Sequence, residues 1–337
     1  MPPQSRNRRQ SAWRGGGGGV NLGVMGKIVL FGQAPFGRAV LDGLLERGHE
    51  ITGVCTPAAR EGAPLDPVAE GATQAGLRLI QRKSYKGEEA HAQVAAESAD
   101  LGVLAFVTQI IPLQMVDAPR LGSVCFHPSL LPAFRGGSAI PWQLIKGESV
   151  GGVTLFRPDA GMDTGPIYLK REAEIGPDAS AGSFYYTKIF DLGVQATLDS
   201  VDGVLDGSLT GDVQDEAQAT YDPLCRDEQA IVSWNRPTAD LHNLIRGCDP
   251  APGAHAMFGG KRIRLFGSRR KGSGSATATA ATPGTVLAVD EVGIEVATAD
   301  GSLVFSKLRT NGAKAAASQV AEAEGISPGA RLDDGKV

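Results

Sequence analysis

Short apolar runs alternate with helical patterns over the first two thirds of the chain. Runs of four to eight largely apolar residues predict buried strands at residues 27–31, 50–55, 100–107 and 122–127. Apolar residues at helical spacing predict helices over residues 38–48, 66–76, 88–96 and 183–206. This alternation predicts an α/β fold, an open and mostly parallel Rossmann-like sheet with helices on both faces.

The pattern changes at residue 231. One helix is predicted over residues 238–247, and short β-like runs separated by turn residues follow it. Such runs are typical of a small β-barrel of the OB type. A length of 337 residues fits two domains at roughly 150 residues each. We therefore divide the chain into a leader (1–24), a catalytic domain (25–210), a linker (211–230) and an OB-like domain (231–333).

The leader is excluded from this fold prediction. It contains four arginines, no acidic residue and a run of five glycines, so we expect it to be disordered. It lacks the apolar middle of a secretory signal, which leaves a transit-like peptide or a true start at Met25 as alternatives. No apolar run approaches the roughly 18 residues of a membrane span. Residues 272–283 are low in complexity and are predicted to form a mobile loop.

Charge and cysteine content narrow the range of partners. The net charge of −4 argues against a generally basic nucleic-acid binder. The segment 261–271 is nevertheless rich in lysine and arginine, and it is interpreted as a solvated strand edge or, less favoured, as an RNA contact. The four cysteines form no CxxC pair, so no metal site is predicted, and reduced thiols in the cytoplasm are expected.

A histidine at a rigid corner is the first candidate for chemistry. His127 ends a predicted strand and precedes Pro128, which disfavours helix at His127. Ligands of open α/β sheets bind beyond the carboxyl ends of the strands, so acid–base work is plausible there. Asp163, in the stretch DAGMDTG, would complete the site, because a carboxylate beside a histidine stabilises the charged ring. The alternatives are a histidine bonded to its own loop and a capped turn.

The stretches HPSLLPAFRGGSAIPWQLIKGE and DAGMDTGPI resemble the formyltransferase family that uses 10-formyltetrahydrofolate. The resemblance extends from Met25 to about Leu332 and includes GKIVLFGQAPFG near its start. Within the family, the chain is most similar to the amino-terminal hydrolase domain of 10-formyltetrahydrofolate dehydrogenase, and next to methionyl-tRNA formyltransferase. The resemblance implies the two-domain architecture described above.

The resemblance also implies roles for individual residues. His127 and Asp163 match the family's catalytic histidine and aspartate, whereas Cys125 stands where the family has its catalytic asparagine. A thiol is a much weaker hydrogen-bond donor than an amide, and the hydrolase domain also lacks this asparagine. Cys125 is interpreted as a small apolar packing residue or, less favoured, as a nucleophile. The family's folate site carries over to Gln109, Ile110, Ile111, Asp159 and Asp163.

Three functions are consistent with these observations. The favoured one is removal of the N10-formyl group of 10-formyltetrahydrofolate, with water or a small nucleophile as acceptor. The second is formylation of methionyl-tRNA; the short segment 55–67, which has one arginine and two acidic residues, opposes it. The third is a catalytically poor folate-binding or RNA-binding protein. The stretch GQAPFG is not GxGxxG, so no nicotinamide cofactor is expected.

Overall fold

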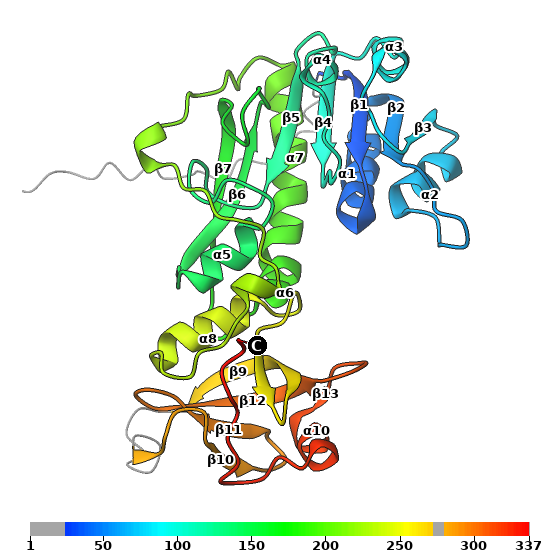
Figure 1. The fold of residues 1–337 in the computed structure, drawn as a ribbon. Helices are drawn as coiled ribbons and strands as arrows, with labels where there is room; N and C mark the ends of the chain where they lie inside the picture. The colour runs from blue at the N-terminus through cyan, green and yellow to red at the C-terminus, as the bar shows by residue number, and fades with distance from the viewer. Residues whose placement is uncertain (1–23, 272–279, 337) are drawn as a thin grey trace, which may run out of the picture.

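Two β-sheet units make up the structure, a computed structural model that describes residues 24–271 and 280–336 (Figure 1). The predicted leader, up to residue 23, lies outside these residues. So do residues 272–279 of the predicted mobile loop. The first unit carries the predicted parallel sheet, and the second carries the predicted barrel.

The first sheet has seven strands in the order β3-β2-β1-β4-β5-β6-β7. The strands are β1 (Lys27–Gly32), β2 (Glu50–Pro57), β3 (Leu79–Arg82), β4 (Leu101–Ala105), β5 (Ser123–His127), β6 (Val150–Phe156) and β7 (Ile167–Glu174). Strands β1 to β5 run parallel, and β6 and β7 extend the sheet antiparallel. The predicted open, mostly parallel sheet is confirmed. The carboxyl ends of its parallel strands share one edge, where the chemistry was expected.

Helices cover both faces of this sheet because the strands are apolar on both sides. One face packs against α1 (Ala34–Glu46), α2 (Pro67–Gln74) and α7 (Phe190–Leu205). The other face packs against α3 (Glu88–Ala95) and α4 (Leu113–Val116). The predicted helix over 183–206 is a continuous helical run made of α6 (Ala181–Phe184), a π-helical turn (Tyr185–Ile189) and α7. None of the helices in the described ranges is long and apolar enough to cross a membrane.

The predicted linker lies along the first unit. Asp212 exchanges two backbone hydrogen bonds with Ile167 of β7. Further on, the indole nitrogen of Trp142, on α5 (Ala139–Ile145), donates to the carbonyl oxygen of Pro223 at 2.7 Å. We call residues 211–226 the strap, because they are bonded at both ends to the unit that they cross.

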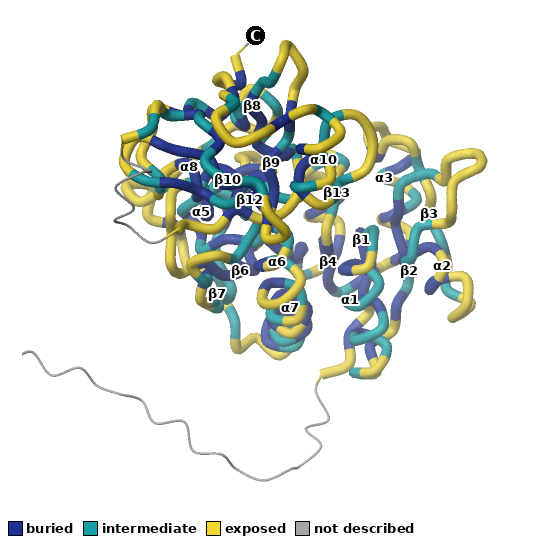
Figure 2. The backbone as a smooth tube through the Cα atoms, turned by 90° about the horizontal axis from the view of Figure 1, so that it is seen from below, coloured by how far each residue is buried: buried dark blue, intermediate teal, exposed yellow. Residues whose placement is uncertain are grey.

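The second sheet is antiparallel, in the order β10-β11-β12-β9-β8, with β13 paired to β12. Its elements are α8 (Thr238–Gly247), β8 (His255–Phe258), β9 (Lys261–Lys271), β10 (Val286–Val289), β11 (Ile294–Ala297), β12 (Ser302–Arg309), β13 (Ala315–Ala316) and α10 (Ala317–Glu324). Figure 2 shows buried strands inside exposed loops in this unit. Its core contains Trp234, Phe305 and Leu332.

The carboxyl-terminal segment closes this sheet into a barrel. The nitrogen of Leu332 donates to the carbonyl oxygen of Gly284, just before β10. On its other side, Asp333 exchanges two backbone hydrogen bonds with Met257 of β8. The segment therefore pairs with both open edges of the sheet, which confirms the predicted barrel-like domain and leaves it fewer exposed edges.

Helix α8 joins the two units by packing against α5. Arg246 donates to the carbonyl oxygens of Gly176 and Ala179, both at 3.3 Å. His242, which is buried, donates from Nε2 to the carbonyl oxygen of Pro177 at 3.0 Å. These bonds satisfy backbone groups that the interface would otherwise bury unpaired.

We expect Leu332→Ala to lower the free energy of unfolding by about 3 kcal/mol, because it removes buried apolar atoms from the strand that closes the barrel. Leu332 is 1% exposed. Urea denaturation followed by circular dichroism measures the loss. The matched control Val292→Ala, at a residue 70% exposed, should change the value by less than about 0.5 kcal/mol. Equal losses in both variants would contradict the role of the closing segment.

Candidate active site at the carboxyl edge of the parallel strands

His127 ends β5 and is held by the loop that follows it. The imidazole Nε2 donates to the carbonyl oxygen of Phe134 at 2.8 Å. A carbonyl only accepts, so this bond places a proton on Nε2 and leaves Nδ1 facing the site. The ring is only 6% exposed, and its orientation is therefore fixed before any ligand binds.

The loop reaches this position through a strained residue. Phe134 has φ +60, a conformation that a non-glycine residue adopts at a cost. Its nitrogen donates to Oγ1 of Thr220 in the strap at 2.8 Å. The Ser129 hydroxyl donates to the carbonyl oxygen of Ala133 at 2.7 Å. One contact from the strap and one within the loop thus stabilise the conformation that aims the Phe134 carbonyl at His127.

Asp163 lies opposite the histidine. Its Oδ2 accepts the backbone N–H of Gly136 at 2.7 Å and lies 3.6 Å from Nδ1 of His127. Asp163 also has a positive φ, +56, so both sides of the pair depend on strained backbone. The fold therefore brings together the two residues that the sequence placed far apart.

The two glycines that flank Asp163 are needed for close approach. A Cβ on Gly165 would lie 1.8 Å from the carbonyl oxygen of Arg157, and one on Gly161 would lie 2.0 Å from Oγ1 of Thr164. Neither glycine has a positive φ. In the structure the left-handed conformation belongs to Asp163 itself.

Burial controls the charge on His127. Removal from water lowers the pKa of His127 below its ordinary value of 6.5, and the carboxylate of Asp163 opposes this by raising it. The bond to the Phe134 carbonyl raises it further. The ring is therefore predominantly neutral at pH 7, and Asp163 is the group that favours its charged form.

Cys125 lies two residues before His127 on β5. Its side chain packs against the core on the α3–α4 face of the sheet. Burial, and then the negative charge of Asp163, raise the pKa of the Cys125 thiol. A thiol with a raised pKa is a poor nucleophile, so this environment favours packing over covalent chemistry.

Two supporting residues were missed by the sequence analysis. Arg135 is 1% exposed, and its guanidinium donates to Gln214 and Glu216 of the strap at 2.7 and 2.6 Å. The amide of Gln214 in turn donates to the carbonyl oxygens of Asp163 and Gly165. Nothing in the sequence pattern pointed to Gln214.

The residues assigned to folate by resemblance lie on two segments, the one that follows β4 and the loop that carries Asp163. The Gln109 amide donates to the carbonyl oxygens of Arg82 and Lys83, so it ties the segment after β4 to the end of β3. Ile111 is partly buried, whereas Ile110 is 75% exposed. Asp159 is exposed, and its Oδ1 accepts from Gly161 and Thr164, which shapes the loop that carries Asp163.

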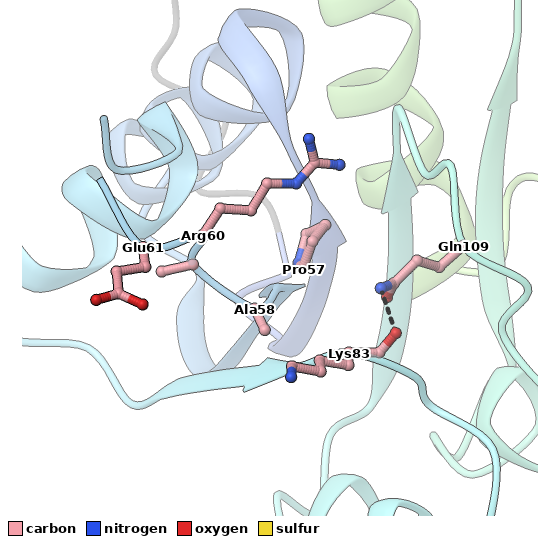
Figure 3. A pocket seen from close by; sticks show the side chains of 7 residues that line it. Pro57, Ala58, Arg60, Glu61, Lys83 and Gln109 are labelled. Atoms are coloured by element: carbon pink, nitrogen blue, oxygen red, sulfur yellow. Dashed lines mark hydrogen bonds between the residues drawn. The ribbon is translucent and has the colours of Figure 1, made fainter. Parts of the chain in front are cut away.

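Two neighbouring cavities open at this edge of the sheet. The larger, about 490 Å³, is lined by Pro57, Ala58, Ala59, Arg60, Glu61, Lys83 and Gln109 (Figure 3). The smaller cleft shares Pro57 and Gln109 with it and adds Gln33, Tyr85 and Ile111. Both cavities lie beyond the carboxyl ends of β1 to β4, and His127 ends the adjacent strand β5. The edge thus offers space for a ligand at the ends of the strands next to β5, and neither His127 nor Asp163 lines these two cavities.

The basic segment 261–271 forms β9, and most of its charges are paired. Four side chains form ion pairs: Lys261 with Glu324, Arg262 and Arg264 with Asp227, and Lys271 with Glu295. Arg269 and Arg270 form none among the described residues. Paired charges attract phosphates less strongly, which favours the interpretation as a solvated strand edge. Residues 24–271 and 280–336 also hold no cluster of three side chains suited to a metal ion.

Two family descriptions match the chain. "Formyl transferase" matches residues 26–201, and "Formyl transferase, C-terminal domain" matches residues 225–323. The matched ranges correspond to the parallel-sheet unit and to the barrel with the end of the strap.

Relatives of two kinds are similar in sequence. Cytosolic 10-formyltetrahydrofolate dehydrogenase of Xenopus tropicalis is 38% identical over 247 residues, which cover 72% of this chain and 27% of that protein. The chain thus spans about a quarter of the length of this relative. Methionyl-tRNA formyltransferase of Trichlorobacter lovleyi is 34% identical over 293 residues, which cover 86% of this chain and 90% of that protein.

Solved structures share the fold. HypX from Aquifex aeolicus, in complex with tetrahydrofolic acid, is 20% identical, with a TM-score of 0.64. The similarity covers 88% of this chain and 47% of that one. At this identity the likeness supports the two-unit architecture alone.

We expect Asp163→Asn to lower the pKa of His127 further, because the substitution removes the negative charge that raises it. Titration of the histidine ring protons by NMR measures this pKa. His242, whose ring contacts Ser268 and Pro177, is the internal control and should titrate as in the wild type. An unchanged or higher pKa of His127 would contradict the role of Asp163 in raising it.

Proposed function

The chain belongs to the formyl transferase family, and we propose that it removes the N10-formyl group of 10-formyltetrahydrofolate and passes it to water or a small nucleophile. The observation that carries this proposal is the pair His127–Asp163, 3.6 Å apart at the carboxyl edge of the sheet. The similarity to a 10-formyltetrahydrofolate dehydrogenase supports 10-formyltetrahydrofolate as the donor of the formyl group. No metal or nicotinamide is required for this reaction.

The proposed reaction proceeds through a tetrahedral intermediate. Oxygen of water adds to the formyl carbon, the formyl oxygen becomes an oxyanion, and the bond from carbon to N10 then breaks. Oδ2 of Asp163 accepts the N–H of Gly136, so we assign Oδ1 as the atom that takes the proton of the nucleophile. Asp163 then delivers this proton to N10, which leaves as the amine of tetrahydrofolate, and formate is released.

His127 would stabilise the oxyanion. Because Nε2–H is committed to Phe134, the donor is Nδ1, which carries a proton only in the charged ring. Asp163 favours that form, and the developing oxyanion favours it further. A donor aimed at such an oxygen contributes roughly 3 kcal/mol, or about 100-fold in rate. Gln109 and Ile111, which both line the smaller cleft at the same edge, are proposed to hold the pterin ring, with Ile110 and Asp159 at the border of this site.

Water or a small acceptor is favoured over tRNA by two observations. Cys125 replaces the amide that helps transfer in the family, and its thiol is a weak donor. The basic strand β9 is largely paired with carboxylates. Methionyl-tRNA formylation is the second candidate, because the match to Trichlorobacter lovleyi methionyl-tRNA formyltransferase covers 90% of that protein.

Purified protein should release formate and tetrahydrofolate from 10-formyltetrahydrofolate without any tRNA. His127→Ala should reduce the rate at least about 100-fold, while His91→Ala, on α3, should leave it unchanged. A parallel reaction contains initiator methionyl-tRNA. Turnover only in that reaction would replace the proposal with the second candidate. Tight folate binding without turnover in either reaction would indicate a folate-binding protein.

Asp163→Asn should abolish turnover while folate still binds, because the amide keeps the loop but cannot take a proton. We expect a loss of at least about 100-fold in kcat with little change in the dissociation constant of tetrahydrofolate, measured by fluorescence titration. Asp42→Asn, on α1, is the matched control. Turnover retained in Asp163→Asn would exclude Asp163 as the proton carrier.

A further inference from the structure

Two cysteines face one another where the strap meets α8. Cys225 lies in the strap, and Cys248 caps the carboxyl end of α8. Their sulfur atoms are 3.7 Å apart. A disulfide bond is roughly 2 Å long, so the sulfurs would need to approach by only about 1.7 Å. The pair is not part of the site at His127, and no local pattern of residues indicates it.

Only one of the two thiols can be reached from solvent. Cys225 is partly exposed and lines a cavity of about 500 Å³ together with Ser138, Pro141 and Pro252. Cys248 is completely buried, with an exposed fraction of 0%. A small oxidant in this cavity would therefore meet Cys225 first, and Cys248 would be protected from it.

The hydrogen bond between the thiols reinforces this asymmetry. Either thiol can donate in this contact, but a Cys225 thiolate can only accept, so a hydrogen bond from the Cys248 thiol stabilises that thiolate and lowers the pKa of Cys225. The same bond, together with burial, raises the pKa of Cys248. Because the thiolate is the reactive form, the accessible sulfur is also the better nucleophile.

We propose that Cys225 and Cys248 form a reversible dithiol–disulfide couple that exchanges with small disulfides such as oxidised glutathione. The Cys225 thiolate attacks one sulfur of the oxidant and releases one molecule of reduced thiol. Cys248 then attacks the Cys225 sulfur of the mixed disulfide and releases the second. Two electrons pass from the cysteine pair to the oxidant, and both cysteine protons end on the released thiols.

The bond would fasten the strap to the second unit. The backbone nitrogen of Cys225 donates to Oγ of Ser138, just before α5, and Lys146, just after α5, pairs with Asp222 at 2.8 Å. The strap is thus attached by hydrogen bonds and an ion pair to α5, while Cys248 belongs to α8. Oxidation would add a covalent link between the strap and the end of α8, and it would join two residues that are 23 positions apart in the chain.

Incubation of the full chain with mixtures of reduced and oxidised glutathione tests the proposal. We expect loss of two thiols, a cross-linked peptide containing Cys225 and Cys248, and a rise in Tm of roughly 5 °C. Dithiothreitol should reverse all three changes. Absence of the cross-linked peptide at every ratio would overturn the proposal.

Single variants test the order of the two steps. Cys248→Ser should stop at one glutathione adduct on Cys225, detected by mass spectrometry, because the second attacking thiol is missing. Cys225→Ser should carry no adduct on Cys248, since Cys248 is buried. Cys55→Ser is the matched control and should form the cross-link like the wild type. An adduct on Cys248 in folded Cys225→Ser, with folding checked by circular dichroism, would overturn the assignment of Cys225 as the attacking thiol.

Discussion

The buried guanidinium of Arg135 is the interaction on which the candidate site depends. A charge removed from water is costly unless paired and hydrogen-bonded, and Arg135 meets this condition through Gln214, Glu216 and Tyr221. The loop that carries Arg135 supplies the Phe134 carbonyl that orients His127 and the Gly136 nitrogen that holds Asp163. Gln214 connects the same network to the Asp163 backbone. One buried cation therefore joins the histidine loop, the aspartate loop and the strap.

This network explains how two strained residues persist. Phe134 and Asp163 both have left-handed backbone conformations, which cost energy for non-glycine residues. Bonds from Thr220 and Gln214, both in the strap, hold them from outside. The strain is local, and the contacts that oppose it come from a distant part of the chain. An accurate geometry at His127 and Asp163 therefore requires the strap to be in place.

The same burial that fixes the geometry also sets the chemistry. Removal from water keeps His127 predominantly neutral and keeps the Cys125 thiol protonated, while Asp163 favours the charged histidine. A site of this kind can respond to a developing negative charge without holding a permanent positive one. The second unit contacts the first through α5 and the residues before α6. Most cations of its basic strand are already used in ion pairs.

The sequence by itself determined the parallel-sheet unit, the barrel-like unit, the family, and the positions of His127 and Asp163 at strand and loop ends. These follow from periodicity and from short motifs, which are local in the chain. Only the tertiary structure decided that His127 and Asp163 meet, that Asp163 rather than its flanking glycines has the unusual φ, and that Gln214 and Arg135 support both. It also decided that Cys225 lies beside Cys248 and that the carboxyl-terminal segment around Leu332 closes the barrel. The physical reason is that these features are contacts between residues far apart in the chain, and periodicity records only which face of an element is buried.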